Sequence, residues 1–212
     1  MNPWTEIPAH PSYVLADDLP YVEVFNQNCN NPELIVNTRH PPVPRMGPIN
    51  APFVILQGNP SFDTTHPEGP IDEELQLALS NLKDETQPHQ GALSTDSWWT
   101  SRLQPLVDEV GKEQLSHKML SIEFFPYRSN KFGHGDIRLP SQWYTFSLVK
   151  EALARQAVII VARNWNLWCS AVPGLFRERE KTVFQSINPR SAQYNSTHLG
   201  RKAFEAILEK IS

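Results

Sequence analysis

Cysteine is scarce in this sequence, and its scarcity excludes two kinds of small stabilised protein. Cys29 and Cys169 are the only cysteines among 212 residues, too few for a disulfide framework or a cysteine-rich zinc site. No apolar run approaches the roughly 18 residues that a membrane-spanning helix needs. The first residues, Met1–Glu6, lack the basic and apolar regions of a secretory signal. These absences predict a cytoplasmic protein.

Several motifs of catalysis and cofactor binding are also missing. The seven histidines are scattered and form no His-x-x-x-His pair, which argues against a metal site. The sequence has no Gly-x-Ser-x-Gly turn, which argues against a serine hydrolase. It has neither a Gly-x-Gly-x-x-Gly run nor a phosphate-binding loop. We therefore expect no metal and no nucleotide cofactor.

Each half of the chain is poor in charge of one sign. Residues 1–116 carry 5 Lys and Arg against 16 Asp and Glu, a net charge of −11. Residues 117–212 carry 14 against 7, a net charge of +7. This asymmetry is typical of a face that binds a polyanion, although two differently charged solvated faces would give the same count.

The distribution of proline predicts two regions. Nine prolines interrupt residues 1–50, and proline excludes long helices and central strands. We expect residues 1–50 to form a proline-rich N-terminal arm packed on a single α/β domain, which comprises residues 51–212.

Short apolar runs predict the strands of that domain. They lie at residues 53–56, 119–125, 157–162 and 182–187, and segments with apolar residues at helical spacing separate them. Strands that alternate with amphipathic helices imply a parallel sheet covered on both faces. The predicted fold is a three-layer α/β/α sandwich with a central four-stranded parallel sheet.

Three of the predicted strands end in polar side chains beside a proline. These exits are Gln57–Phe62, Glu123–Tyr127 and Ser186–Tyr194. Ligands of open α/β sheets bind beyond the carboxyl ends of the strands, so we expect the functional site there.

In these exits the chain resembles the uracil-DNA glycosylase superfamily, over roughly residues 50–212. Gln57-Gly58-Asn59-Pro60-Ser61 is similar to the Gly-x-Asn-Pro-Gly or Gly-Gln-Asp-Pro-Tyr turn that follows the first strand in that family. The second exit resembles the Asn-x-x-Pro segment of the single-strand-selective branch. Pro189-Arg190-Ser191-Ala192, followed by a helix, resembles the loop that grips the DNA backbone. The resemblance implies a monofunctional DNA glycosylase that flips out a base.

Two departures from the family pattern bear on the substrate. Glu123 stands where the family has a base-reading Asn. Depending on the register of the third motif, either Ser186 or Asn188 takes the place of the catalytic histidine. In both registers a histidine electrophile is absent, which argues against activity on plain uracil.

The chemistry of the residues predicts two catalytic groups, Asn59 and Glu123, and the resemblance implies Asn188 as a third in the register that gives it the place of the histidine. Asn59 can hold the attacking water by its carbonyl oxygen. Glu123 can accept a hydrogen bond from the exocyclic amine of cytosine, and when buried and neutral it can donate a proton to the leaving base. The alternatives are a plain Asn-Pro turn at Asn59, and a Glu123 that faces solvent or pairs with Arg128 or Lys131.

Further residues in the exits are predicted to contact the ligand. Small Ser61 leaves room beside C5 of a flipped pyrimidine, and aromatic rings stack on bases, although most aromatic residues belong to a core. The predicted base-binding residues are Gln57, Gly58, Ser61, Phe62, Phe125 and Tyr127. The predicted DNA-binding residues are Arg190, Ser191, Tyr194, His198, Arg201 and Lys202.

The sequence thus predicts removal of a cytosine-type base that carries a 5-substituent, with a conceivable role in defence against bacteriophages. The expected partner is DNA, without a membrane, and the protein is expected to be a monomer. Two alternatives stay open: a repair glycosylase for uracil or hypoxanthine, and a non-catalytic DNA-binding module that kept the fold.

Overall fold

The computed structural model describes residues 1–61, 68–95, 97–188 and 193–212. The chain divides into two compact units, each assembled from three segments that are distant in sequence. Most of the predicted N-terminal arm belongs to the first unit. Unit 1 comprises Met1–Arg45, Gly58–Asp84 and Glu123–Phe146, and unit 2 comprises Met46–Gln57, Glu85–Ile122 and Ser147–Ser212.

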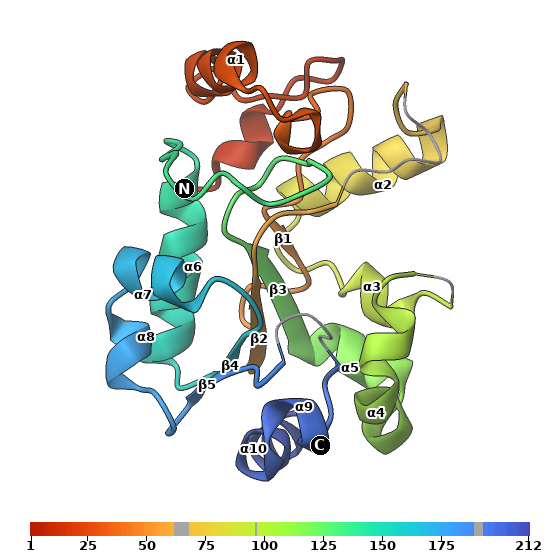
Figure 1. Cartoon of the computed structure of the whole chain (residues 1–212). Coiled ribbons are helices and arrows are strands. Elements are labelled where there is room, and N and C mark those ends of the chain that lie inside the picture. Colours follow the sequence, from red (N-terminus) through yellow and green to blue (C-terminus); the bar gives the residue numbers. More distant parts are fainter. Residues whose placement is uncertain (62–67, 96, 189–192) are drawn as a thin grey trace. The chain divides into compact units, whose positions relative to one another are not determined.

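Helices and short strands follow one another along the chain (Figure 1). In chain order they are η1 (Pro3–Glu6), α1 (Leu19–Asn28), η2 (Pro32–Leu34), β1 (Arg45–Met46), β2 (Phe53–Gln57), α2 (Asp72–Lys83), α3 (Gln90–Leu93), α4 (Thr100–Val110), α5 (Lys112–Lys118), β3 (Met119–Glu123), α6 (Gln142–Ala154), β4 (Val158–Val161), α7 (Trp165–Ala171), α8 (Gly174–Arg177), β5 (Val183–Gln185), α9 (Ser196–Leu199) and α10 (Arg201–Ile211).

The strands form one sheet of five in the order β1-β3-β2-β4-β5. β2 pairs in parallel with β4, and β4 pairs in parallel with β5. All four predicted strands are present and the α/β class is confirmed, but the predicted number of four strands is wrong because β1 adds an edge strand. β1 is two residues long and lies between Pro44 and Pro48, so it carries no alternating pattern that could reveal it.

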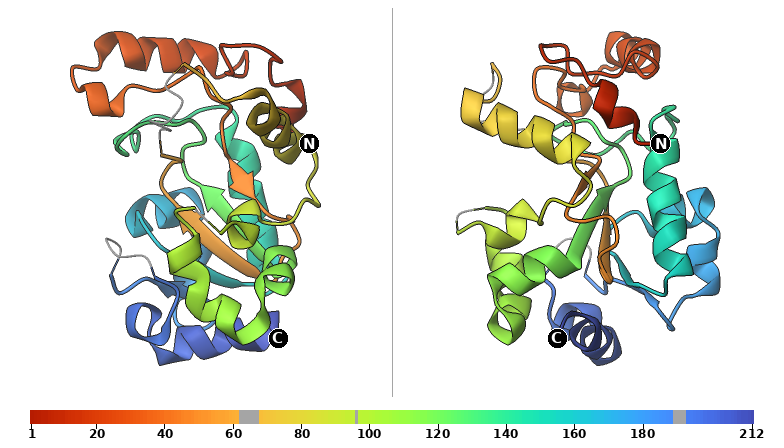
Figure 2. Two further views of the ribbon diagram at one scale, coloured as in Figure 1. Left: turned by 90° about the vertical axis from the view of Figure 1, so that its right-hand side faces the viewer. Right: turned by 180° about the vertical axis from the view of Figure 1, so that it is seen from behind.

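The central strand β2 is buried along its whole length. On one face of the sheet, Phe53 and Ile55 join a core that includes Leu106 of α4 and Ile207 of α10. On the other face, the Trp168 indole of α7 donates a hydrogen bond to the Gln57 carbonyl at 2.8 Å. Figures 1 and 2 show α4 and α5 on one side of the sheet and α7 and α8 on the other. Helices cover both faces, as the continuous apolar run of β2 predicts.

Unit 1 contains a buried carboxyl group, that of Asp18. Asp18 is fully buried, and its carboxyl accepts hydrogen bonds from the Tyr127 hydroxyl at 2.8 Å and the Ser141 amide at 3.0 Å. Burial raises the pKa of Asp18, although the hydrogen bonds from Ser141 and Tyr127 oppose the rise. The Tyr127 hydroxyl also accepts from the Leu15 amide at 3.2 Å, and Trp4 packs edge-on against the Tyr127 ring. These contacts tie the N-terminal segment to the segment after β3.

A buried histidine closes the start of α3 in unit 2. His89 Nδ1 accepts a hydrogen bond from the Ala92 amide at 3.2 Å, so the ring proton lies on Nε2. Nε2 then donates to the Ser121 hydroxyl at 3.0 Å, and the ring packs edge-on against Trp99. Burial lowers the pKa of His89 to about 3, which keeps the imidazole neutral in the folded protein.

We expect His89 to make folding sensitive to acid. Between pH 6.5 and about pH 3 the unfolded chain binds a proton at this residue and the folded chain does not, so stability falls as the pH falls. His89 alone should lower the free energy of unfolding by about 1.4 kcal/mol per pH unit in this window. Urea denaturation at a series of pH values gives the free energy of unfolding as a function of pH. This free energy should fall less steeply with falling pH for His89→Gln than for wild type, and an equal fall in both proteins would contradict the prediction.

Candidate functional site

The loops that follow β2 and β3 lie side by side in unit 1. The Phe125 amide donates to the Gly58 carbonyl at 2.8 Å, and the Ser129 amide donates to the Pro60 carbonyl at 3.4 Å. Ser61 and Ser129 form an isolated parallel bridge. The structure therefore brings two of the three predicted exits together.

The orientation of the Asn59 amide follows from its neighbours. Its Nδ2 donates to the Ser129 hydroxyl oxygen at 2.8 Å and lies 3.1 Å from the Pro60 carbonyl and 3.4 Å from the Ser129 carbonyl. Ser129 donates its single hydroxyl proton to the Lys131 carbonyl at 2.8 Å, so its oxygen can only accept from Asn59. All three neighbours of the amide group are acceptors there, which places NH₂ toward them and Oδ1 away from them.

Arg128 holds the loop after β2 by hydrogen bonds to backbone carbonyls. Its guanidinium donates to the Ser61 carbonyl at 2.8 Å and to the Pro41 carbonyl at 3.3 Å. Its own carbonyl accepts from the Asn37 amide at 2.8 Å. Arg128 therefore links the β2 exit to the segment before β1.

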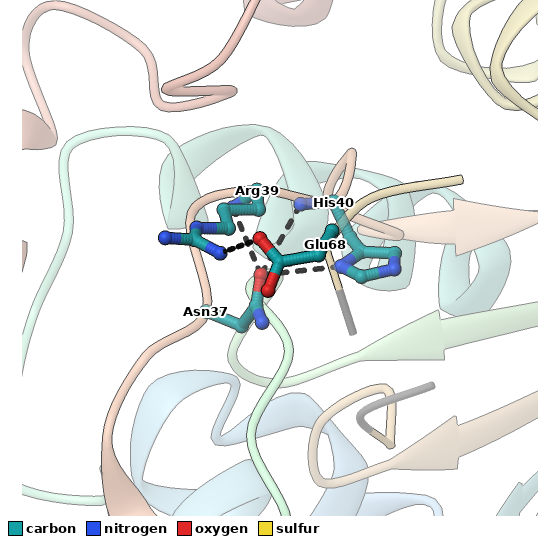
Figure 3. A network of polar contacts seen from close by, with 4 residues as sticks. All are labelled: Asn37, Arg39, His40 and Glu68. Carbon is teal, nitrogen blue, oxygen red and sulfur yellow. Dashed lines mark hydrogen bonds and ion pairs between the residues drawn. The ribbon is translucent and has the colours of Figure 1, made fainter. Parts of the chain in front are cut away.

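A polar network holds that segment (Figure 3). Asn37 Oδ1 accepts from the Arg39 amide at 2.8 Å and from the His40 amide at 3.2 Å. Arg39 forms an ion pair with Glu68, the first described residue after position 67. An Asn that bonds to the backbone two and three residues ahead fixes a turn, so local hydrogen bonds hold the segment that Arg128 contacts at Asn37 and Pro41.

Glu123 ends β3 at the border of this site. Its side chain is half-buried, and its amide donates to the Pro44 carbonyl at 3.0 Å. Lys131, one of the two cations considered as its partner, forms an ion pair with Glu33. The carboxyl group is carried by the last residue of a strand rather than by a loop.

The structure places two predicted base-stacking residues in the core of unit 1. Phe125 and Tyr127 are fully buried. The Phe125 ring stacks on His134, with 4.3 Å between the ring centres, and the Tyr127 hydroxyl bonds to Asp18. Both rings have a packing role, which argues against the predicted stacking on a base.

Unit 2 holds the residues around the third exit and the end of β2. The Gln57 side chain donates to the Tyr194 hydroxyl at 3.1 Å, and the Tyr194 ring lies parallel to Trp99. Gln57 and Tyr194 are both buried, so neither presents its side chain to solvent. This burial argues against the predicted DNA contact of Tyr194 and the predicted base contact of Gln57.

The remaining predicted residues of unit 2 differ in exposure. Asn188 is exposed, whereas Ser186 is buried and its amide donates a hydrogen bond to the Val161 carbonyl. His198 bonds to the Asn195 side chain that caps α9. Arg201 pairs with Glu205 at 2.6 Å, and exposed Lys202 donates to the Glu180 carbonyl. The predicted contacts Phe62, Arg190 and Ser191 lie outside the described residues.

Sequence reasoning missed two features of the site region. Ser129, which orients Asn59, follows the second exit by two residues, and its importance depends on a contact with Asn59 across 70 positions. The end of β4 also carries a polar pocket, although the rule that identified the other exits applies to β4 as well.

In comparisons with other proteins, no family model, no curated protein and no solved structure matches the chain. Across the described ranges, no group of three or more His, Cys, Asp or Glu is placed to hold a metal ion. None of the described helices has both the length and the apolar character to cross a bilayer.

The orientation of Asn59 can be tested by stability. Asn59→Asp keeps the shape but puts a carboxylate against three acceptors at neutral pH, whereas Asn59→Ala only removes the donor. We expect Asn59→Asp to have a free energy of unfolding about 1–3 kcal/mol lower than that of Asn59→Ala, measured by urea denaturation. The difference should shrink at acidic pH, where a protonated carboxyl can donate. Asn28→Asp, at an exposed amide that donates to the Val24 carbonyl, is the control and should change stability less.

Proposed function

We propose that this protein is a DNA glycosylase that hydrolyses the N-glycosidic bond of a flipped cytosine-type base carrying a 5-substituent. The observation that carries the proposal is the fixed amide of Asn59 at the end of the central strand, with its carbonyl oxygen turned away from the protein acceptors. The resemblance of the strand exits to the uracil-DNA glycosylase superfamily supplies the reaction class.

The proposed reaction needs a placed water more than a strong base. The base is first flipped out of the stack. Cleavage of the glycosidic bond then leaves positive charge on the sugar, and a water oriented toward C1′ completes the hydrolysis. Asn59 Oδ1 accepts a hydrogen bond from that water and orients it. Because the Ser129 hydroxyl holds the amide in one orientation, the acceptor is in place before the substrate binds.

Two residues are proposed to select the base. One oxygen of the Glu123 carboxyl accepts a hydrogen bond from the exocyclic amine of cytosine and repels O4 of uracil. When the carboxyl is protonated, its other oxygen donates the proton to the ring, which makes the base a better leaving group and leaves Glu123 as a carboxylate. Ser61 is exposed and small, which leaves room for a substituent at C5.

The third exit is proposed to contact the DNA backbone. Between the two candidates for the histidine position, the exposed Asn188 is better suited to meet a ligand than the buried Ser186. Arg201 and Lys202, both exposed at the start of α10, supply positive charge for phosphates. The net charge of +7 over residues 117–212 supports the same assignment.

The formation of abasic sites in DNA tests the activity. DNA carrying a panel of bases, including 5-substituted cytosines, uracil and hypoxanthine, should yield abasic sites with 5-substituted cytosines only. Asn59→Ala should lower the rate roughly 100-fold to 1000-fold, as the loss of one positioned group does in other enzymes. Ser129→Ala keeps Asn59 but removes the hydroxyl that orients its amide. The rate of base excision by this variant should lie between those of Asn59→Ala and wild type.

The same assay separates the alternatives. Asn28→Ala is the control variant and should retain wild-type activity. Equal cleavage by wild type and Asn59→Ala would indicate a contaminating enzyme. No cleavage of any base, with DNA binding intact, would favour a non-catalytic DNA-binding module, and preference for uracil or hypoxanthine would favour a repair glycosylase.

Glu123→Gln tests the selection of the base. The amide keeps the shape of the carboxyl but cannot transfer a proton, so cleavage of the 5-substituted cytosine should fall roughly 100-fold or more, while binding of the same DNA falls less. Single-turnover rates and equilibrium binding measured on the same substrate separate the two effects. Full activity of Glu123→Gln on cytosine derivatives would remove Glu123 from the mechanism.

A further inference from the structure

A polar pocket lies at the carboxyl ends of β4 and β5, within unit 2. Its volume is about 660 Å³, and its lining includes Asn164 and Trp165 after β4, Phe176 of α8, Arg179, and Gln185 at the end of β5. Open α/β sheets bind ligands at this edge, and pockets of this size hold small organic groups. None of these residues belongs to the site around Asn59.

The aromatic groups of the pocket suit a flat ligand. The Arg179 guanidinium lies over the Trp165 ring, 5.2 Å from its centre. Phe176 is 62% exposed, so much of its ring is open to contact with a ligand. A planar ring that stacks on Trp165 or Phe176 would bury this exposed apolar surface, and Arg179 adds a cation that can contact a phosphate.

The polar groups of the pocket suit the edge of a base. Asn164 adopts the left-handed conformation (φ 58°, ψ 41°) at the N-cap of α7, and its side chain makes no capping hydrogen bond there. Asn166 and the exposed Gln185 also line the pocket. Amide side chains donate and accept together, as the hydrogen-bonding edges of nucleobases require.

We propose that this pocket binds an unpaired nucleobase of single-stranded DNA, with the base stacked against Trp165 and Phe176 and the adjacent phosphate near Arg179. The choice of DNA rests on the proposed function, because a strand held for base flipping offers unpaired nucleotides beyond the target. Aromatic stacking tolerates any base, so the pocket should hold a strand without reading its sequence.

Binding of a fluorescently labelled, unmodified oligothymidylate tests the proposal without any base excision. Phe176→Ala should weaken binding roughly 5-fold to 100-fold, the range for the loss of one base–aromatic stack. Arg179→Lys keeps the charge but not the planar group, so it should weaken binding while the dependence of affinity on salt stays that of wild type. Free thymidine monophosphate should compete much more weakly than the oligonucleotide.

Matched variants control for general effects on the surface. Trp143→Ala removes another exposed aromatic side chain, 72% exposed in unit 1, and Arg177→Ala removes a charge two residues before Arg179; both should bind like wild type. Unchanged binding by Phe176→Ala and Arg179→Lys would overturn the proposal, as would equal losses in the controls. Competition by the free nucleotide as strong as that by the strand would overturn the assignment to DNA.

The outcome is separable from that of the proposed function. If the protein excises no base but binds the oligonucleotide through Phe176, the proposed binding of a nucleobase in the pocket is supported and the proposed glycosylase activity is contradicted. If the protein excises bases but binds the oligonucleotide equally well without Phe176, the proposed glycosylase activity is supported and the proposed role of the pocket is contradicted.

Discussion

The single proton of the Ser129 hydroxyl is the constraint on which the candidate site depends. That proton goes to the Lys131 carbonyl, so the oxygen must accept, and Asn59 must turn its NH₂ toward it. An amide that is free to rotate presents a donor and an acceptor with equal ease, and it cannot order a water in one direction. The segment that follows the β3 exit therefore determines which atom of Asn59 is available for chemistry.

The fold could be predicted from the sequence where burial is continuous, and less well where it is not. β2 and β4 are fully buried strands, and an unbroken apolar run reveals such strands directly. The edge strand β1 is two residues long beside prolines, and its existence depends on the neighbouring strand rather than on its own pattern. The sequence also gives no sign that His89 is fully buried and caps α3.

The site was predictable at the level of loops but not of individual side chains. Position at a strand end identified Asn59, Ser61 and Glu123, because the chain must become polar where the buried strand stops. It could not separate an aromatic ring that faces a ligand from one that completes a core. Phe125, Tyr127 and Tyr194 follow strand ends as the predicted ligand contacts do, yet each is buried against partners that are distant in sequence: His134, Asp18 and Trp99. Burial is a property of the tertiary structure, and aromatic residues satisfy both roles equally well.

The side chains of the β2 exit differ in how firmly hydrogen bonds hold them. Gln57 and Asn59 have their amides held by hydrogen bonds within their own units, so a substitution at either changes folding as well as chemistry. Ser61 contributes only its backbone carbonyl to a described hydrogen bond, with Arg128, and its side chain is exposed. Side chains at position 61 can therefore vary in size while the loop keeps its backbone support. A glycosylase built on this loop would change its tolerance for substituents at C5 through position 61, without disturbing the group that orients the water.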